Sequence, residues 1–290
     1  MSGLPFHWHL GELIVIVAAG AAHHLMVPEV KLRRRCELGL LALAVVLVWP
    51  IGDLAASVSL TVATVQRLTI MLLVAPTLLT ATPMRVFERL THPAPIDRSL
   101  KLLSHPGGAL VLVTIVGTGS LVPPMVDWGA RSGVGRGVVV AITLAAGFLL
   151  WLPVIHVVPG TRALSPIARA GYLFASSLVV TSLSIVWIFS RHPLYPALHG
   201  QRALVDMSPL LDQQVAGFVA KLGAFACLWT IAFVIFARAD GETVPTEESP
   251  LYWADVERAM LRVDRERERE QRRRLRGGPA SGPTGPPESP

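Results

Sequence analysis

Long apolar runs place the strongest constraint on how this chain can fold. A transmembrane helix needs about 20 mostly apolar residues, because it rises 1.5 Å per residue through a hydrocarbon core about 30 Å thick. About seven runs meet this requirement: Leu10–Val27, Leu38–Val58, Leu60–Ala81, Ala109–Val126, Gly137–Val158, Ala170–Phe189 and Val215–Ala237. The sequence therefore predicts an all-α fold, a polytopic membrane helix bundle of about seven transmembrane helices.

The charge content agrees with a chain that folds in lipid. Charged residues make up 16% of the sequence and the mean hydropathy is +0.52, whereas soluble domains carry about 25% charged residues. The formal net charge is +6, but the basic residues lie mostly in loops and a tail beside apolar runs. In that setting positive charge indicates topology, and we expect no nucleic-acid binding. Cys36 and Cys227 indicate neither a disulfide framework nor a cysteine metal site.

The distribution of Lys and Arg between alternate loops predicts the orientation, because these residues are retained on the cytoplasmic side. On the other side, the N-terminus and the second loop contain none, and the remaining two loops contain only Arg131, Arg136, Arg191 and Arg202. The first, third and fifth loops carry Lys31, Arg33, Arg34, Arg35, Arg85, Arg89, Arg98, Lys101, Arg162 and Arg169, and the C-terminal segment adds a long Arg series. We therefore predict an N-out, C-in arrangement with a cytoplasmic C-terminal tail.

The composition changes after Arg238 and predicts three regions. Residues 1–239 form the seven-helix transmembrane domain. Residues 240–276 form a charged cytoplasmic tail, in which Trp253, Val256, Met260 and Val263 have the spacing of a short amphipathic helix. Residues 277–290 are rich in Gly, Pro and Ser and are predicted to be disordered.

Ionisable residues inside spans are costly and usually face the bundle interior, so they are the first candidates for function. In the predicted topology these residues lie in the outer half of the membrane. Together with Gln213 they form a polar outer-half cluster: Glu12, Asp53, Arg67, Asp212, Gln213 and Lys221. Glu12 or Asp53 would pair with Arg67, and Asp212 with Lys221. Structural neutralisation and a functional site both remain open as explanations.

Four histidines are predicted on the outer side: His7, His9, His192 and His199. Imidazoles with nearby Met and carboxylate groups are ligands for copper or zinc. Met125, Asp127, Met207 and Asp212 are predicted on the same side and could complete such a site. The alternative is that these histidines contact lipid headgroups. The inner-side histidines are poorer candidates, because His23 and His24 are adjacent and point about 100° apart on a helix.

No hydrolase, nucleotide-binding or dinucleotide-binding fingerprint is present, so we expect no enzyme activity. Prolines inside or near the ends of the spans remove helix hydrogen bonds and permit kinks. They are Pro50, Pro76, Pro123, Pro124 and Pro153. Packing alone can account for such prolines, although kinked helices also leave room for a cavity.

Three segments resemble the cytochrome c oxidase assembly factors of the CtaG type, seven-span membrane proteins of bacteria. They are Val65-Gln66-Arg67 through Met71–Pro76 to Pro83, then Pro159 through Leu164-Ser165-Pro166 to Pro193-Leu194-Tyr195-Pro196, and finally Leu211-Asp212-Gln213-Gln214-Val215-Ala216-Gly217. The resemblance implies a multi-pass protein of the plasma membrane. It further implies a partner subunit of a haem-copper oxidase and a role in maturation of the copper centre at the outer membrane face.

Two departures from the family pattern keep an alternative open. The resemblance implies two histidines four residues apart on the third span, where this chain has Ala63 and Arg67. It also implies a Met-Trp pair on the last span, where this chain has Ala220 and Lys221. The first hypothesis is copper insertion, with the outer histidines as ligands. The second is a non-metal scaffold or partner-binding protein of the same fold, and a small-solute carrier is the least favoured.

Overall fold

Helices form every regular element in the part of the chain that the structure describes. The computed structural model describes residues 9–48, 50–91, 94–158, 161, 163–195, 207–242 and 267. The helices are α1 Leu10–Met26, α2 Val30–Leu47, α3 Ile51–Ser57, α4 Leu60–Thr69, the π-helix η1 Ile70–Val74, α5 Ala75–Ala81, α6 Met84–Thr91, α7 Ala94–Leu103, α8 Pro106–Gly119, α9 Pro123–Arg131, α10 Gly133–Ile155, α11 Pro166–Val179, α12 Ser182–Phe189 and α13 Pro209–Glu242. The prediction of an all-α fold is confirmed for these residues.

Four helical stretches within the described residues are long and apolar enough to cross a membrane. They are Leu60–Ala81, Gly133–Ile155, Pro166–Phe189 and Pro209–Ala239. The helices α8 and α9 meet at a bend of 57° and make a fifth if they are counted as one span. The helix α1 is apolar but has only 17 residues.

Two of the predicted apolar runs are divided at prolines. The run Leu38–Val58 is split between α2 and α3 beside Pro50, and the run Ala109–Val126 is split between α8 and α9, which begins at Pro123. Proline has no backbone N–H and its ring clashes with the preceding turn, so it begins helices more easily than it continues them. Prediction from hydropathy gives the runs but does not give the breaks.

Serine side chains fix the beginnings of three helices. Ser59, Ser132 and Ser165 each accept a hydrogen bond from the backbone N–H three residues later, at the start of α4, α10 and α11. Such caps satisfy N–H groups that have no partner inside the helix. These three helices therefore begin at positions that the sequence determines locally.

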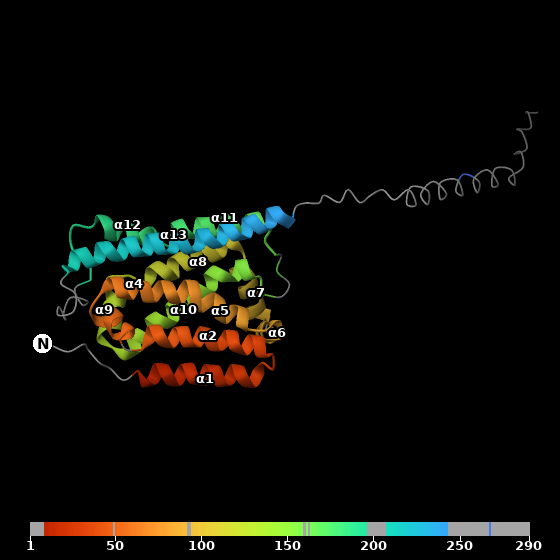
Figure 1. The fold of residues 1–290 in the computed structure, drawn as a ribbon, viewed down its shortest axis with the longest axis horizontal. Helices are drawn as coiled ribbons and strands as arrows, with labels where there is room; N and C mark the ends of the chain where they lie inside the picture. The colour runs from red at the N-terminus through yellow and green to blue at the C-terminus, as the bar shows by residue number, and fades with distance from the viewer. Residues whose placement is uncertain are drawn as a thin grey trace, which may run out of the picture. The chain divides into compact units, whose positions relative to one another are not determined.

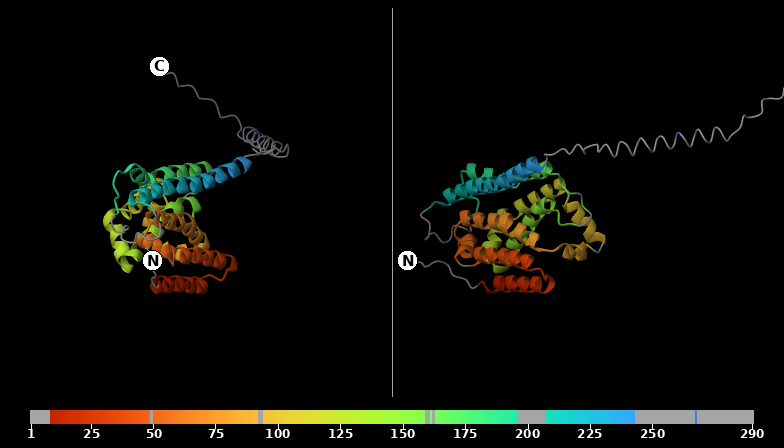
Figure 2. Two further views of the ribbon diagram at one scale, coloured as in Figure 1. Left: turned by 60° about the vertical axis from the view of Figure 1, so that its left-hand side comes forward. Right: turned by 45° about the vertical axis from the view of Figure 1, so that its right-hand side comes forward.

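The helices of residues 1–239 lie side by side, with α1 and α2 on one side and α11, α12 and α13 on the opposite side (Figures 1 and 2). The largest buried cluster joins the middle of the bundle to α11 and α13 through Met71, Ala75, Val113, Leu150, Leu173 and Leu228. A second buried cluster joins α2 to the π-helix through Leu43, Val46, Ile70 and Val74. The π-helix therefore lies between the two clusters.

Side chains of the adjacent helix α10 stabilise the π-helix. A π-helix pairs each N–H with the carbonyl five residues earlier, so Pro76 would leave the carbonyl of Met71 without a donor. The indole Nε1–H of Trp151 donates to that carbonyl over 2.9 Å. Gly147, one turn away on α10, permits the close approach, because a Cβ there would lie 2.7 Å from the Cβ of Ala75.

A similar compensation occurs where α2 ends. In a continuous helix the N–H of residue 50 would donate to the carbonyl of Val46, but residue 50 is proline. The amide Nε2 of Gln66 on α4 donates to this carbonyl over 2.6 Å. A side chain from another helix thus satisfies the carbonyl at each of these two proline positions, as is expected where water is scarce.

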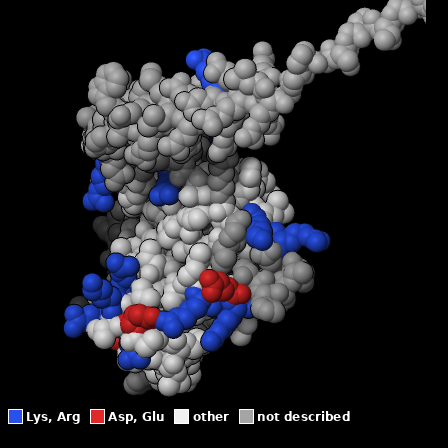
Figure 3. Space-filling view, turned by 90° about the vertical axis from the view of Figure 1, so that its right-hand side faces the viewer, with Lys and Arg blue, Asp and Glu red and all other residues white. Residues whose placement is uncertain are grey.

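Basic side chains gather at the end of the bundle that includes the start of α2, α6 and α7 (Figure 3). These elements carry Arg33, Arg34, Arg35, Arg85, Arg89, Arg98 and Lys101. Arg85 forms an ion pair with Glu29 there. Arg33 donates to the carbonyls of His24 and Val27 and so holds the α1–α2 turn.

Residues 240–290 form a separate unit. Of these, the structure describes only residues 240–242 and 267. The predicted amphipathic helix of the charged tail and the predicted disordered segment 277–290 lie outside the described residues.

Candidate functional site

A cavity of about 100 Å³ lies between α3, α4, α9, α10 and the end of α8. Its wall is largely apolar, with Ala55, Ala63, Ile70 and Val140 among the lining residues. The polar side chains on the wall are Thr64, Gln66, Arg67, Ser120, Arg136 and Thr143. Two arginines therefore border one small space inside the bundle.

The guanidinium of Arg67 is held by α8 and α10. Its Nη1 donates to the hydroxyls of Ser120 over 2.7 Å and Thr143 over 3.3 Å, and its Nη2 donates to the carbonyl of Gly117 over 2.7 Å. Both hydroxyls donate their own protons to backbone carbonyls, so their oxygens are oriented as acceptors. The end of α8 also presents the negative end of its helix dipole to this cation.

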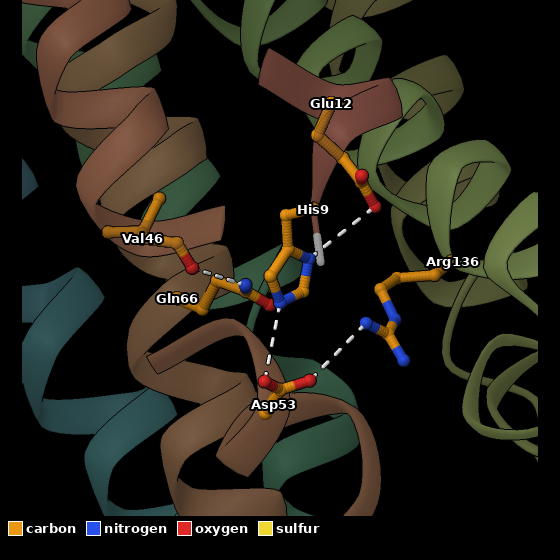
Figure 4. A network of polar contacts seen from close by, with 6 residues as sticks. All are labelled: His9, Glu12, Val46, Asp53, Gln66 and Arg136. Carbon is orange, nitrogen blue, oxygen red and sulfur yellow. Dashed lines mark hydrogen bonds and ion pairs between the residues drawn. The ribbon is translucent and has the colours of Figure 1, made fainter. Parts of the chain in front are cut away.

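The second arginine is part of a chain of polar groups that extends to the start of α1 (Figure 4). Arg136 Nη1 lies 3.7 Å from Oδ1 of Asp53, and Oδ2 of Asp53 lies 3.4 Å from Nε2 of His9. The other ring nitrogen of His9 lies 3.7 Å from the carboxylate of Glu12. Asp53 and His9 are both buried, whereas Glu12 is partly exposed.

Asp212 caps the neighbouring helix α4 from the start of α13. Its carboxylate accepts hydrogen bonds from the backbone N–H of Leu60 over 2.6 Å, the N–H of Thr61 over 3.2 Å and the hydroxyl of Ser59 over 2.8 Å. The Thr61 hydroxyl donates in turn to the Asp212 carbonyl. A carboxylate at a helix N-terminus satisfies unpaired N–H groups and complements the helix dipole.

The two glutamines that follow Asp212 hold the segment between α12 and α13. The buried Gln213 accepts a hydrogen bond from the N–H of Leu194 over 2.7 Å, and Gln214 reaches the carbonyl of Ser190. The Tyr195 hydroxyl donates to the carbonyl of Leu121 over 2.8 Å and accepts from the indole of Trp187. Burial raises the pKa of Tyr195 to about 12.

The structure does not form the predicted ion pairs of Arg67 and Lys221. Arg67 binds hydroxyls and a carbonyl rather than Glu12 or Asp53. Lys221 donates to the hydroxyl of Thr181 over 3.2 Å, not to Asp212. Asp212 and Lys221 are nine residues apart on one helix, about 13.5 Å along its axis, so they cannot meet. The predicted outer-half cluster is therefore divided among several local networks.

The predicted histidine set is only partly within the described residues, because His7 and His199 lie outside them. His9 is engaged with Asp53 and Glu12 through its two ring nitrogens. His192 is exposed, and its backbone N–H and carbonyl bond to the side chain of Ser190. Across the described ranges, no three His, Cys, Asp or Glu residues are grouped so that they could hold a metal ion.

Two important side chains were not among the predicted site residues. Arg136 was counted only as a loop charge, although the structure places it on α10 against Asp53. Trp151 was part of an apolar run, and its hydrogen bond to a carbonyl of another helix has no signature in the sequence. The only available signal for Arg136 was its position one residue before the predicted fifth span.

Comparison with known proteins gave one family. A family model described as cytochrome c oxidase caa3 assembly factor matches residues 36–239, which include every residue that lines the cavity. No curated protein and no solved structure matched the chain.

Proposed function

The chain belongs to the family of cytochrome c oxidase caa3 assembly factors, and on this premise we propose that it helps to insert copper during maturation of a haem-copper oxidase at the outer face of the membrane. The observation that carries the proposal is the extent of the family match, which runs from α2 to α13. The partner would be an oxidase subunit. The proposed role is that of an assembly chaperone without a catalytic reaction of its own.

The proposed setting is the plasma membrane of a bacterium, crossed seven times with the N-terminus outside and the C-terminal tail in the cytoplasm. Seven crossings result if α2 with α3, α4 through α5, α8 with α9, and α11 with α12 each count as one span beside α1, α10 and α13. The basic end formed by α2, α6 and α7 supports the orientation, because Lys and Arg are retained on the cytoplasmic side. The same arrangement puts Arg136, Asp53 and Asp212 toward the outer side.

The proposed copper ligands are His7, His9, His192 and His199, because neutral imidazole nitrogens suit copper. The cavity itself does not fit the metal. Arginine has no lone pair to offer, and Arg67 occupies the place where the family pattern has a histidine. Copper would therefore be handled at the outer histidines as cargo rather than beside Arg67.

One observation favours a second candidate function, a non-metal membrane scaffold or partner-binding protein of the same fold. Arg67 is bound by three acceptors and lines the cavity together with Arg136, so the interior is arranged for a cation side chain. A protein that had lost the metal could still bind the oxidase subunit during assembly.

Copper loading separates the two candidates. The purified full chain would be loaded with Cu(I), and bound metal would be measured before and after His7, His9, His192 and His199 are all replaced by Ala. His24→Ala is the matched control, because this histidine is exposed and bonds to Glu37 near the basic end. Copper insertion predicts bound metal that is lost in the fourfold variant and kept in the control.

Absence of tight copper from the unaltered protein would reject the copper role and favour the scaffold. Both candidate functions include a role in oxidase assembly, and oxidase activity in cells that lack the chain tests that role. Activity that is undiminished in such cells would reject an assembly role altogether.

A further inference from the structure

Arg67 is a membrane-embedded cation for which the described residues supply no anionic partner. Among the described residues no carboxylate forms an ion pair with it, and hydroxyl and carbonyl oxygens occupy three of its five N–H donors. A charge inside a bundle is costly unless an opposite charge compensates it, and such residues mark binding sites or ion paths. The remaining donors of Arg67 therefore leave capacity for an anion.

The described side chains that line the cavity leave one positive charge in excess. The second lining cation, Arg136, lies 3.7 Å from Asp53, which compensates it. The Nε–H of Arg136 is buried and has no hydrogen-bond partner. Like charges on the wall of an apolar cavity also repel one another, because the effective dielectric constant is low. One bound monoanion would neutralise the excess and could accept from both guanidinium groups.

The size and lining of the cavity restrict what could bind there. A volume of about 100 Å³ is several times that needed for one water molecule, which occupies about 10–15 Å³ on the same measure, but it is too small for a large ligand. A guanidinium binds planar oxyanions through two parallel hydrogen bonds. The apolar wall disfavours a second negative charge, because desolvation would not be compensated.

We propose that the cavity between α3, α4, α9 and α10 binds a small, singly charged, planar oxyanion, a carboxylate or bicarbonate, between Arg67 and Arg136. The anion accepts hydrogen bonds from the free donors of the two guanidinium groups. The proposal is independent of copper and of the oxidase, since it rests on the cavity and its charges alone.

Thermal unfolding of the purified full chain tests the proposal. Tryptophan fluorescence would be followed while sodium chloride is replaced by sodium acetate or sodium bicarbonate at constant ionic strength, with sodium phosphate as a comparison. We expect a saturable rise in the melting temperature with acetate or bicarbonate and a smaller response to phosphate. The anion that raises the melting temperature more at equal concentration is the preferred one of the two.

Two variants remove the site in different ways. Arg67→Gln removes the charge, and Ala63→Leu fills the cavity without changing any charge. Each should raise the half-saturating concentration at least tenfold. Arg131→Gln is the matched control, since this arginine lies on α9 but is exposed and pairs with Asp127. If Arg67→Gln does not fold, Ala63→Leu still decides the outcome.

Three results would overturn the proposal: no saturable response of the unaltered protein, a larger response to phosphate, or equal responses of Ala63→Leu and the unaltered chain. Absence of any response would favour instead a carboxylate supplied by a partner protein.

Discussion

Replacement of Asp212 should destabilise the protein strongly, because its carboxylate joins α13 to α4. Its replacement by Ala leaves the N–H groups of Leu60 and Thr61 and the hydroxyl of Ser59 without their acceptor. Each unsatisfied group costs about 1–3 kcal/mol, and the partly buried setting allows water to compensate some of it. We expect Asp212→Ala to lower the free energy of unfolding by about 3–5 kcal/mol.

The assay is unfolding of the purified protein in a denaturing detergent titration, followed by loss of helical signal. Asp212→Asn retains one acceptor oxygen and should cost less, about 1–3 kcal/mol. Asp127→Asn is the matched control, because Asp127 forms an ion pair over 3.6 Å with an exposed arginine. Such pairs contribute about 0–1 kcal/mol.

A double-mutant cycle distinguishes the cap from the ion pair expected from the sequence. Since Asp212 and Lys221 share no contact, the effects of Asp212→Ala and Lys221→Met should add within about 0.5 kcal/mol. The capping role is refuted if Asp212→Ala costs no more than Asp127→Asn. A coupling energy well above that limit would restore the ion pair instead.

Three further predictions concern buried contacts. Trp151→Phe should lower the unfolding free energy by about 1–3 kcal/mol in the same titration, because the Met71 carbonyl loses its donor while the ring bulk remains; an unchanged value would contradict this. Gly147→Val should destabilise far more than Gly137→Val, since a Cβ at 147 meets Ala75 at 2.7 Å whereas nothing lies within 4 Å at 137; equal melting temperatures of the two variants would be inconsistent with the packing. The pKa of Tyr195 rises from its ordinary value of 10.0 to about 12 on folding, so the stability that the protonated hydroxyl contributes is complete below pH 10 and is lost as the pH rises toward 12. Tyr195→Phe should therefore reduce the fall of the unfolding free energy between pH 10 and pH 12. An equally steep fall in the variant would contradict this assignment.

The sequence predicted the helical class well because hydropathy is a local property. An apolar run such as Gly137–Val158 favours lipid as its surroundings and forms its backbone hydrogen bonds within itself, so α10, Gly133–Ile155, was predicted in the right place with both ends shifted by about one turn. The breaks at Pro50 and Pro123 were anticipated as kinks. Their size depends on neighbouring helices, and so the division of two runs was not predictable.

The candidate site was predicted less well because it depends on which helix faces which. Asp53, Arg67 and Asp212 were singled out as polar groups in or beside spans, but Arg67 and Asp212 do not form the ion pairs expected of them. Asp53 does meet an opposite charge, but it is that of Arg136. Opposite charge was used as the guide, whereas Arg67 and Asp212 have hydroxyls, a carbonyl and a helix N-terminus as partners. These groups occur throughout the sequence, so charge complementarity alone could not identify them.

The π-helix gives one further consequence. It accommodates an extra residue in the span Leu60–Ala81, and one residue turns an α-helix by about 100°. Deleting a single residue between Ile70 and Val74 would therefore rotate the face that carries Arg67 relative to the face that meets Gly147 and Trp151. One residue thus sets the angle between the helix face that lines the cavity and the helix face that packs against α10. Inserting or deleting a single codon there would turn one face away from its partner.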